Sequence, residues 1–127
     1  MSCARCDAPT LSVTVPEHLL EPAPGEAIDV CTTCLTVEAA ADGAANPDFD
    51  RISEAVPDGD AGVATLLLAG LLESLATNRA AIETVVEALE ADGTDPMLVL
   101  DELATDPGLE PAVDIGRRSH QLEQLVL

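Results

Sequence analysis

The sequence contains no lysine, no tryptophan and no tyrosine, and its single aromatic residue is Phe49. It has 24 acidic residues and only five arginines, so the formal charge is −19 over 127 residues. A nucleic-acid-binding protein normally presents a basic stripe and aromatic side chains on which bases stack. The densest basic cluster here is Arg117-Arg118, so the composition disfavours nucleic acid as a partner.

Long apolar runs are also missing. The longest stretch without a charged residue is residues 61–72, which is 12 residues, whereas a membrane-spanning helix needs about 20. The N-terminus shows no apolar core of a signal peptide. We therefore expect no membrane segment and a cytoplasmic location.

The negative charge is spread along the chain. Residues 1–46 hold one arginine and seven acidic residues (−6), and residues 47–127 hold four arginines and 17 acidic residues (−13). At the same time 47% of the residues are apolar, unlike a disordered acidic chain. A surface this negative repels itself at low ionic strength and becomes stable when salt screens it. Together with the absence of lysine, this composition indicates the cytoplasm of a halophilic organism.

Four cysteines lie within the first 34 residues and form two C-x2-C pairs, Cys3 with Cys6 and Cys31 with Cys34, separated by 24 residues. This spacing is typical of a tetrahedral zinc site in which each pair forms a tight turn, or knuckle. We therefore predict one structural Zn²⁺ bound by these four cysteines. Because four thiolates fill the coordination sphere and leave no position for water or substrate, we expect the protein not to be an enzyme.

Two other interpretations of the cysteines stay open. A C-x-x-C pair can perform thiol redox chemistry, but it then lies at a helix N-terminus, and neither pair precedes a helical pattern. The cysteines could also form two disulfides, which are typical of secreted proteins. His18 lies between the pairs and His120 lies near the end of the chain, and we expect both at the surface rather than at a site.

The segment between the cysteine pairs predicts a β-hairpin. Residues 11–15 alternate apolar and hydroxyl side chains, as a half-buried strand does. Residues 26–30 predict the returning strand after a turn rich in proline and glycine, and residues 35–38 predict a third short strand. We therefore expect a zinc ribbon and linker over residues 1–46, with the linker beginning at residue 39.

After residue 46 the apolar period changes from two to 3.6, which predicts a helical unit over residues 47–127. The first expected helix is short, contains Phe49, Ile52 and Val56, and is ended by Pro57. The second is apolar and is capped by Asp60. The third is amphipathic, begins after Asn78 as its cap, ends near Gly93, and has this apolar face: Ile82, Val85, Val86 and Leu89. Two more are expected: one begun by Asp95-Pro96 that buries Met97, Leu100 and Leu103, and one from about Pro111 to the C-terminus that buries Ile115, Leu122, Leu125 and Val126. The predicted fold class is α+β, a zinc ribbon followed by a small bundle of four to five helices.

The apolar helix, from Ala61 to Leu75, has leucines on more than one face. Such a helix is either central in a core or shared with a second subunit. We expect it at the centre of the helical unit. If the neighbouring helices are too short to cover it, a protein partner or a second copy of the chain would bind there.

Several segments together resemble one family. The knuckles resemble those of small haloarchaeal zinc-finger proteins of the C-P-x-C-G type, with Ala4 in place of proline and Asp7 in place of glycine. Downstream, residues 57–62, 93–101 and 117–125 are similar to an uncharacterised haloarchaeal zinc-ribbon family, a domain of unknown function. The resemblance implies a zinc ribbon and its metal, and no activity. Because glycine most easily takes the turn after the second ligand, Asp7 predicts a looser first knuckle.

These observations favour a non-enzymatic protein-interaction or regulatory module in the cytoplasm of a halophilic archaeon. One alternative is a nucleic-acid-associated factor in transcription or translation that uses the ribbon face around Arg5. The other is a thiol redox protein.

Overall fold

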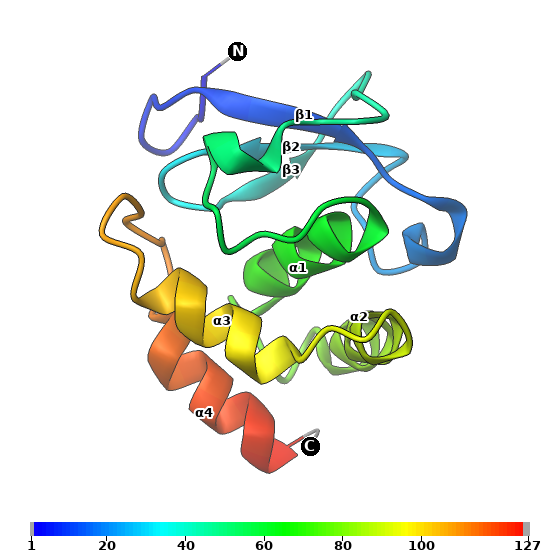
Figure 1. Cartoon of the computed structure of the whole chain (residues 1–127), viewed down its shortest axis with the longest axis vertical. Coiled ribbons are helices and arrows are strands. Elements are labelled where there is room, and N and C mark those ends of the chain that lie inside the picture. Colours follow the sequence, from blue (N-terminus) through cyan, green and yellow to red (C-terminus); the bar gives the residue numbers. More distant parts are fainter. Residues whose placement is uncertain (1, 126–127) are drawn as a thin grey trace.

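The computed structural model describes residues 2–125 (Figure 1). The strands are β1 (Thr10–Thr14), β2 (Ala27–Cys31) and β3 (Val37–Ala39), and the helices are α1 (Asp60–Leu71), α2 (Arg79–Ala91), α3 (Pro96–Ala104) and α4 (Ile115–Leu125). Short 3₁₀ turns form η1 (Glu17–Leu19) and η2 (Phe49–Arg51). The predicted α+β class is confirmed: a small sheet comes first, helices follow, and the cysteines lie beside the strands.

The strands form one antiparallel sheet in the order β1-β2-β3. Leu11 pairs with Val30 and Val13 with Ile28, and all five residues of β2 are buried because β2 is the central strand. The predicted hairpin is therefore present. The third strand starts two residues later than expected, because Leu35 belongs to the second cysteine turn and has a φ of 64°, far from the extended backbone of a strand.

The segment expected as a linker is partly fixed against the outer edge of β1. The N–H of Thr14 donates to the carbonyl of Ala44 over 3.0 Å, and the N–H of Ala44 donates to the carbonyl of Ser12 over 3.1 Å. The hydroxyl of Thr14 also donates to the carbonyl of Gly43. These bonds satisfy edge groups of β1 that would otherwise be available to another strand.

Helix α1 lies between the sheet and the other helices (Figure 1), and every residue from Ala61 to Ala69 is buried. The expected central position is confirmed. Leu72 and Leu75 lie in turns after the helix and are 0% and 7% exposed. Phe49 packs on Gly62 so closely that a Cβ at Gly62 would stand 2.7 Å from the ring, so the glycine is required for this contact.

Helices α2 and α3 follow their sequence signals. Gly93 ends α2 with a φ of 84°, as a helix-terminating glycine does. The carboxylate of Asp95 accepts the N–H groups of Met97 and Leu98, and Pro96 occupies the first helical position. The expected apolar face of α2 is buried: Ile82, Val85, Val86 and Leu89. In α3, Leu100 and Leu103 are buried as expected, while Met97 is only half-buried.

Two helix predictions are wrong in extent. The segment expected as a helix over residues 49–56 forms only η2 and turns. A segment this short between two prolines does not repay helix nucleation, and the hydroxyl of Ser53 accepts the N–H of Ala55 in a competing local turn. Its apolar residues are nevertheless buried: Phe49, Ile52 and Val56.

The last helix starts at Ile115 rather than near Pro111. Asp114 sets this start, because its carboxylate accepts the N–H of Arg117 over 3.1 Å in the manner of a helix cap. Ile115 and Leu122 are buried as expected. Leu125 is 48% exposed, so its predicted burial is wrong, and Val126 lies outside the described residues.

Asn78 precedes α2 as expected but does not cap it with its side chain. Its side-chain amide instead donates to the carbonyl of Leu71 over 3.0 Å. This bond satisfies a carbonyl at the end of α1, where the helix has no further N–H to offer.

Sheet and helices contribute to one hydrophobic core. Val13 and Ile28 from the sheet belong to the same buried cluster as Leu66 of α1, Leu100 of α3 and Leu122 of α4. The division into residues 1–46 and 47–127 stays a prediction about folding units. The shared core means that disturbing the first segment removes apolar contacts from the second.

Candidate metal centre

The four cysteines predicted as ligands come together at one end of the sheet. One Sγ atom from each of Cys3, Cys6, Cys31 and Cys34 lies within 4.8 Å of the others. Cys3 and Cys34 approach to 3.7 Å, and Cys6 and Cys31 approach to 3.4 Å, so both contacts join the first knuckle (residues 3–7) to the second knuckle (residues 31–35). The hairpin β1–β2 brings the knuckles together, because Cys31 ends β2 and pairs with Thr10 at the start of β1.

The two knuckles have the same backbone geometry. The N–H of Asp7 donates to the carbonyl of Cys3 over 2.9 Å, and the N–H of Leu35 donates to the carbonyl of Cys31 over 3.3 Å. Asp7 and Leu35 have φ values of 62° and 64°. Glycine takes this conformation most easily, but both knuckles adopt it without glycine. The first knuckle therefore has the same turn as the second despite its departure from the glycine pattern.

Backbone amides point at two of the sulfurs. The N–H of Arg5 donates to Cys3 Sγ over 3.4 Å, and two N–H groups of the second knuckle donate to Cys31 Sγ at 3.4 and 3.3 Å. Such donors stabilise a thiolate relative to a thiol. Backbone amides of Arg5 and Cys6 accordingly lower the pKa of Cys3 from 9.0 to about 7. The thiolate is the form that binds a metal.

The arrangement fits a tetrahedral metal site. A metal–sulfur bond of about 2.3 Å implies sulfur–sulfur separations of about 3.8 Å in a tetrahedron, close to the 3.4 and 3.7 Å found across the knuckles. A disulfide bond would need about 2.05 Å, and all four cysteines are free. Cys3, Cys31 and Cys34 are buried while Cys6 is exposed. Four cysteines this close could hold one metal ion.

A segment far away in the sequence is bonded to the second knuckle. The N–H of Glu110 donates to the carbonyl of Thr33 over 2.8 Å, and the N–H of Ala112 donates to the carbonyl of Cys34 over 3.0 Å. We call these two bonds the clamp. They tie the connection between α3 and α4 to a knuckle of the cysteine cluster. The sequence gives no signal for the clamp, since it uses backbone groups alone.

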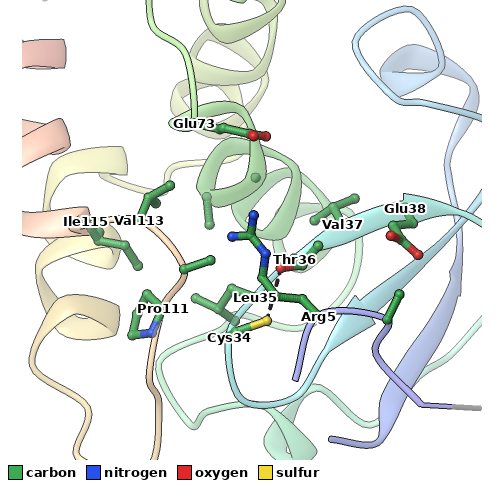
Figure 2. A pocket seen from close by; sticks show the side chains of 14 residues that line it. Arg5, Cys34, Leu35, Thr36, Val37, Glu38, Glu73, Pro111, Val113 and Ile115 are labelled. Carbon is green, nitrogen blue, oxygen red and sulfur yellow. Dashed lines mark hydrogen bonds between the residues drawn. The ribbon is translucent and has the colours of Figure 1, made fainter. Parts of the chain in front are cut away.

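Directly after the second knuckle, the hydroxyl of Thr36 lies 3.0 Å from Cys34 Sγ, drawn as a dashed line in Figure 2. This hydroxyl can donate to the sulfur and so support its thiolate form. His18 and His120 are both exposed and neither belongs to the cysteine cluster, as expected for surface residues. Among the described residues, no helix is both long and apolar enough to cross a membrane.

The fold and site define a small α+β protein with a four-cysteine cluster that could hold a metal ion beside its sheet. The chain belongs to a family of unknown function, DUF6276, whose model matches residues 2–126. Neither a curated protein nor a solved structure matches the chain significantly.

Proposed function

We propose that Cys3, Cys6, Cys31 and Cys34 hold one structural Zn²⁺ in a zinc ribbon, and that the protein is a non-enzymatic interaction or regulatory module. The metal assignment rests on one observation: the four sulfur atoms of two matching knuckles lie within 4.8 Å of one another. Zinc is the metal favoured by four thiolates in a tetrahedron. The bound metal would hold the two knuckles of the ribbon together.

A structural role is supported by the ligand set. Four thiolates complete the coordination of zinc, so none of its positions is left for a water or a substrate. The three-stranded sheet is also short, and a module of this size gains much of its stability from its metal. These points favour a ribbon that presents a surface over one that performs catalysis.

The proposed setting is the cytoplasm of a halophilic archaeon. The support is compositional: a formal charge of −19, no lysine, and an apolar fraction of 47% that is sufficient for a core. The likeness of the knuckles to haloarchaeal zinc fingers points in the same direction. A protein with this surface is most stable where salt is abundant.

A protein partner or second copy bound through residues 61–75 stays a prediction. Because Ala61 to Ala69 are buried, such a partner would require α1 to become uncovered. Two leucines outside α1, Leu98 on α3 and Leu125 on α4, are 57% and 48% exposed. The ribbon face around Arg5 is exposed too, and binding there does not require α1 to move. We therefore propose the ribbon face as the first place to search for a partner.

Elemental analysis of reduced, dialysed protein tests the metal assignment. We expect one zinc per chain in the wild type and a loss of zinc in Cys31→Ser. Thr33→Ser is the matched control, because residue 33 lies in the same knuckle and contributes no sulfur; this variant should keep its zinc. A wild-type protein without zinc, or a Cys31→Ser variant with full zinc, would overturn the assignment.

The interaction role is tested separately by affinity purification at native salt, once with zinc-loaded and once with chelated protein. A partner that co-elutes only with the zinc-loaded form, and is lost when Arg5 is replaced, supports an interaction through the ribbon. Nucleic acid recovered in the same manner would instead support the alternative of a nucleic-acid-associated factor.

A further inference from the structure

A pocket of about 420 Å³ opens beside the second knuckle. Its walls come from three parts of the chain that are distant in sequence: the ribbon with Arg5 and Val37, the end of α1 with Gly70, and the connection before α4 with Val113. Figure 2 shows these walls facing one another across the pocket. Its size falls in the range of small-molecule sites, about 300–1,000 Å³.

Charges of both signs line the pocket. The side chain of Arg5 extends into it, and the carboxylates of Glu38 and Glu73 stand at its edge (Figure 2). Among residues 2–125 the side-chain ion pair that forms is Arg79 with Glu83. Arg5, Glu38 and Glu73 therefore form no ion pair with one another. An arginine and carboxylates placed around a space without pairing are free to bind a ligand of complementary charges.

The end of α1 adds to the negative side of the pocket. Gly70 lies in the last turn of α1, and its carbonyl accepts the N–H of Glu73 over 3.4 Å. The carbonyl end of a helix carries partial negative charge and favours a cation. Glu73 and the end of α1 therefore favour an ammonium group, while Arg5 favours a carboxylate, with which a guanidinium forms two parallel hydrogen bonds.

Apolar side chains complete the wall opposite Glu38. Val113 faces the pocket from the connection before α4 and Ile115 from the start of α4, while Leu35 and Val37 line it from the ribbon (Figure 2). A site that combines aliphatic side chains with a few convergent polar groups is the common design of a small-molecule pocket. The aliphatic wall selects a ligand with a hydrocarbon chain.

We propose that this pocket binds a small zwitterion with an aliphatic chain, the chemistry of a free aliphatic amino acid. The carboxylate is bound by Arg5, the ammonium by Glu73 and the end of α1, and the chain by Val113 and Ile115. A simple anion would satisfy Arg5 but would meet two carboxylates at the edge of the pocket. A simple cation would be repelled by the guanidinium of Arg5 at the centre of the pocket.

The clamp connects this pocket to the cysteine cluster. It holds the wall with Val113 next to the wall with Cys34 and Leu35, since Ala112 donates to the carbonyl of Cys34. The proposal goes beyond the structural metal site, and its test is carried out on full-length zinc-loaded protein at native salt.

The test is a titration followed by amide NMR shifts with three probes. L-leucine carries both charged groups, 4-methylpentanoate lacks the ammonium, and 3-methylbutylamine lacks the carboxylate. We expect L-leucine to cause saturable shifts at the amides of Val37, Gly70 and Val113, and each of the other probes to bind at least about tenfold more weakly, since each leaves a charged partner unsatisfied.

Variants identify the residues that bind. Arg5→Gln and Glu73→Gln should each weaken L-leucine binding by about tenfold or more. Both side chains are exposed, so these changes leave the core intact. Arg79→Gln and Glu87→Gln are the matched controls, because they change the net charge equally and lie on α2, outside the pocket; both should bind as the wild type does.

Three results would overturn the proposal: no saturable shift with L-leucine, equal binding of all three probes, or unchanged binding in Arg5→Gln and Glu73→Gln. The zinc content of the same sample separates the two proposals. Protein with one zinc that does not bind L-leucine overturns the pocket alone, whereas protein that binds L-leucine without zinc overturns the metal assignment alone.

Discussion

Asp7 and Leu35 have positive φ values at the same place in the two knuckles, directly after the second cysteine of each pair. Their side chains lie in different surroundings. Leu35 is 4% exposed and belongs to the hydrophobic core, so its burial offsets the cost of its backbone conformation. The side chain of Asp7 is exposed and gains no such burial.

Replacing Asp7 with glycine should therefore stabilise the protein. Relief of the positive φ contributes about 1 kcal/mol, the added flexibility of the unfolded chain costs about 0.5 kcal/mol, and the net gain in the free energy of unfolding is about 0.5 kcal/mol. Urea unfolding in molar KCl measures it. The control is Gly93→Ala at a φ of 84°, which should be destabilising; lower stability in Asp7→Gly would contradict the assigned strain.

Gly62 reverses the usual effect of replacing glycine by alanine in a helix. Such a change normally stabilises by about 1 kcal/mol. A Cβ at Gly62, however, would stand 2.1 Å from the carbonyl oxygen of Pro57 and 2.7 Å from the ring of Phe49. Gly62→Ala should therefore lower the free energy of unfolding by about 1–3 kcal/mol, as overpacking does.

The matched control for Gly62→Ala is Gly116→Ala in α4. A Cβ at Gly116 would meet its nearest neighbour, the carboxylate of Asp114, at an ordinary 3.7 Å. We expect this variant to be stabilised by about 0.5–1 kcal/mol. Thermal unfolding of both variants under the same conditions would show opposite shifts, and a stabilised Gly62→Ala would disprove the tight contact between α1 and η2.

At the scale of elements, the connection between α3 and α4 is fixed at three points. At its start the carboxylate of Asp106 accepts the hydroxyl of Ser53 and the N–H of Gly108, and these donors lower the pKa of Asp106 below its usual value. The clamp fixes the middle of the connection to the second knuckle, and Asp114 caps α4. The position of α4 therefore depends on the cysteine cluster as well as on the core.

This dependence predicts that removal of the metal loosens the clamp. In hydrogen exchange, the amides of Glu110 and Ala112 should lose protection when zinc is chelated, because their acceptors lie in the second knuckle. The comparison amide is that of Thr94, which donates to the carbonyl of Leu89 at the end of α2 and should lose less protection. Unchanged protection at Glu110 and Ala112 would show that the clamp is independent of the metal.

Local signals predicted most of the elements. The alternation in residues 11–15, the apolar face of α2 and the pair Asp95-Pro96 each act within a few residues, and each gave the correct element. The spacing of the cysteines likewise predicted which side chains meet. These features depend on period and local geometry, which a single sequence contains.

Features that depend on distant contacts were not predicted. The clamp joins Thr33 to Glu110, which are 77 residues apart, and Cys34 to Ala112, which are 78 residues apart. No pattern of side chains predicts these backbone bonds. The start of α4 was misplaced for the same reason, since the N–H groups of Glu110 and Ala112 donate to the second knuckle instead of beginning a helix. The pocket beside Arg5 also arises only when three distant segments come together.

At the scale of the whole molecule, charge is the dominant feature. The formal charge is −19, and a zinc ion with four thiolates would add about −2. The ion pair between Arg79 and Glu83 is exposed on both sides, at 58% and 48%, and such pairs contribute little. Self-repulsion among the acidic side chains therefore opposes the compact state unless salt screens it.

Stability should accordingly rise with salt into the molar range. We expect the melting temperature of the zinc-loaded protein to increase between low and molar KCl, because screening weakens the repulsion between carboxylates. Differential scanning calorimetry at constant zinc measures the change. A melting temperature that is flat or that falls over this range would contradict a fold limited by its own charge.

The metal centre itself is tested most directly by zinc K-edge X-ray absorption on the purified, reduced protein. One shell of four sulfur atoms at about 2.3 Å is the predicted result, because the sulfurs of Cys3, Cys6, Cys31 and Cys34 lie within 4.8 Å of one another. Nitrogen or oxygen atoms in the first shell, or fewer than four sulfurs, would contradict a closed structural site. Absence of a zinc edge from the wild-type protein would contradict it as well.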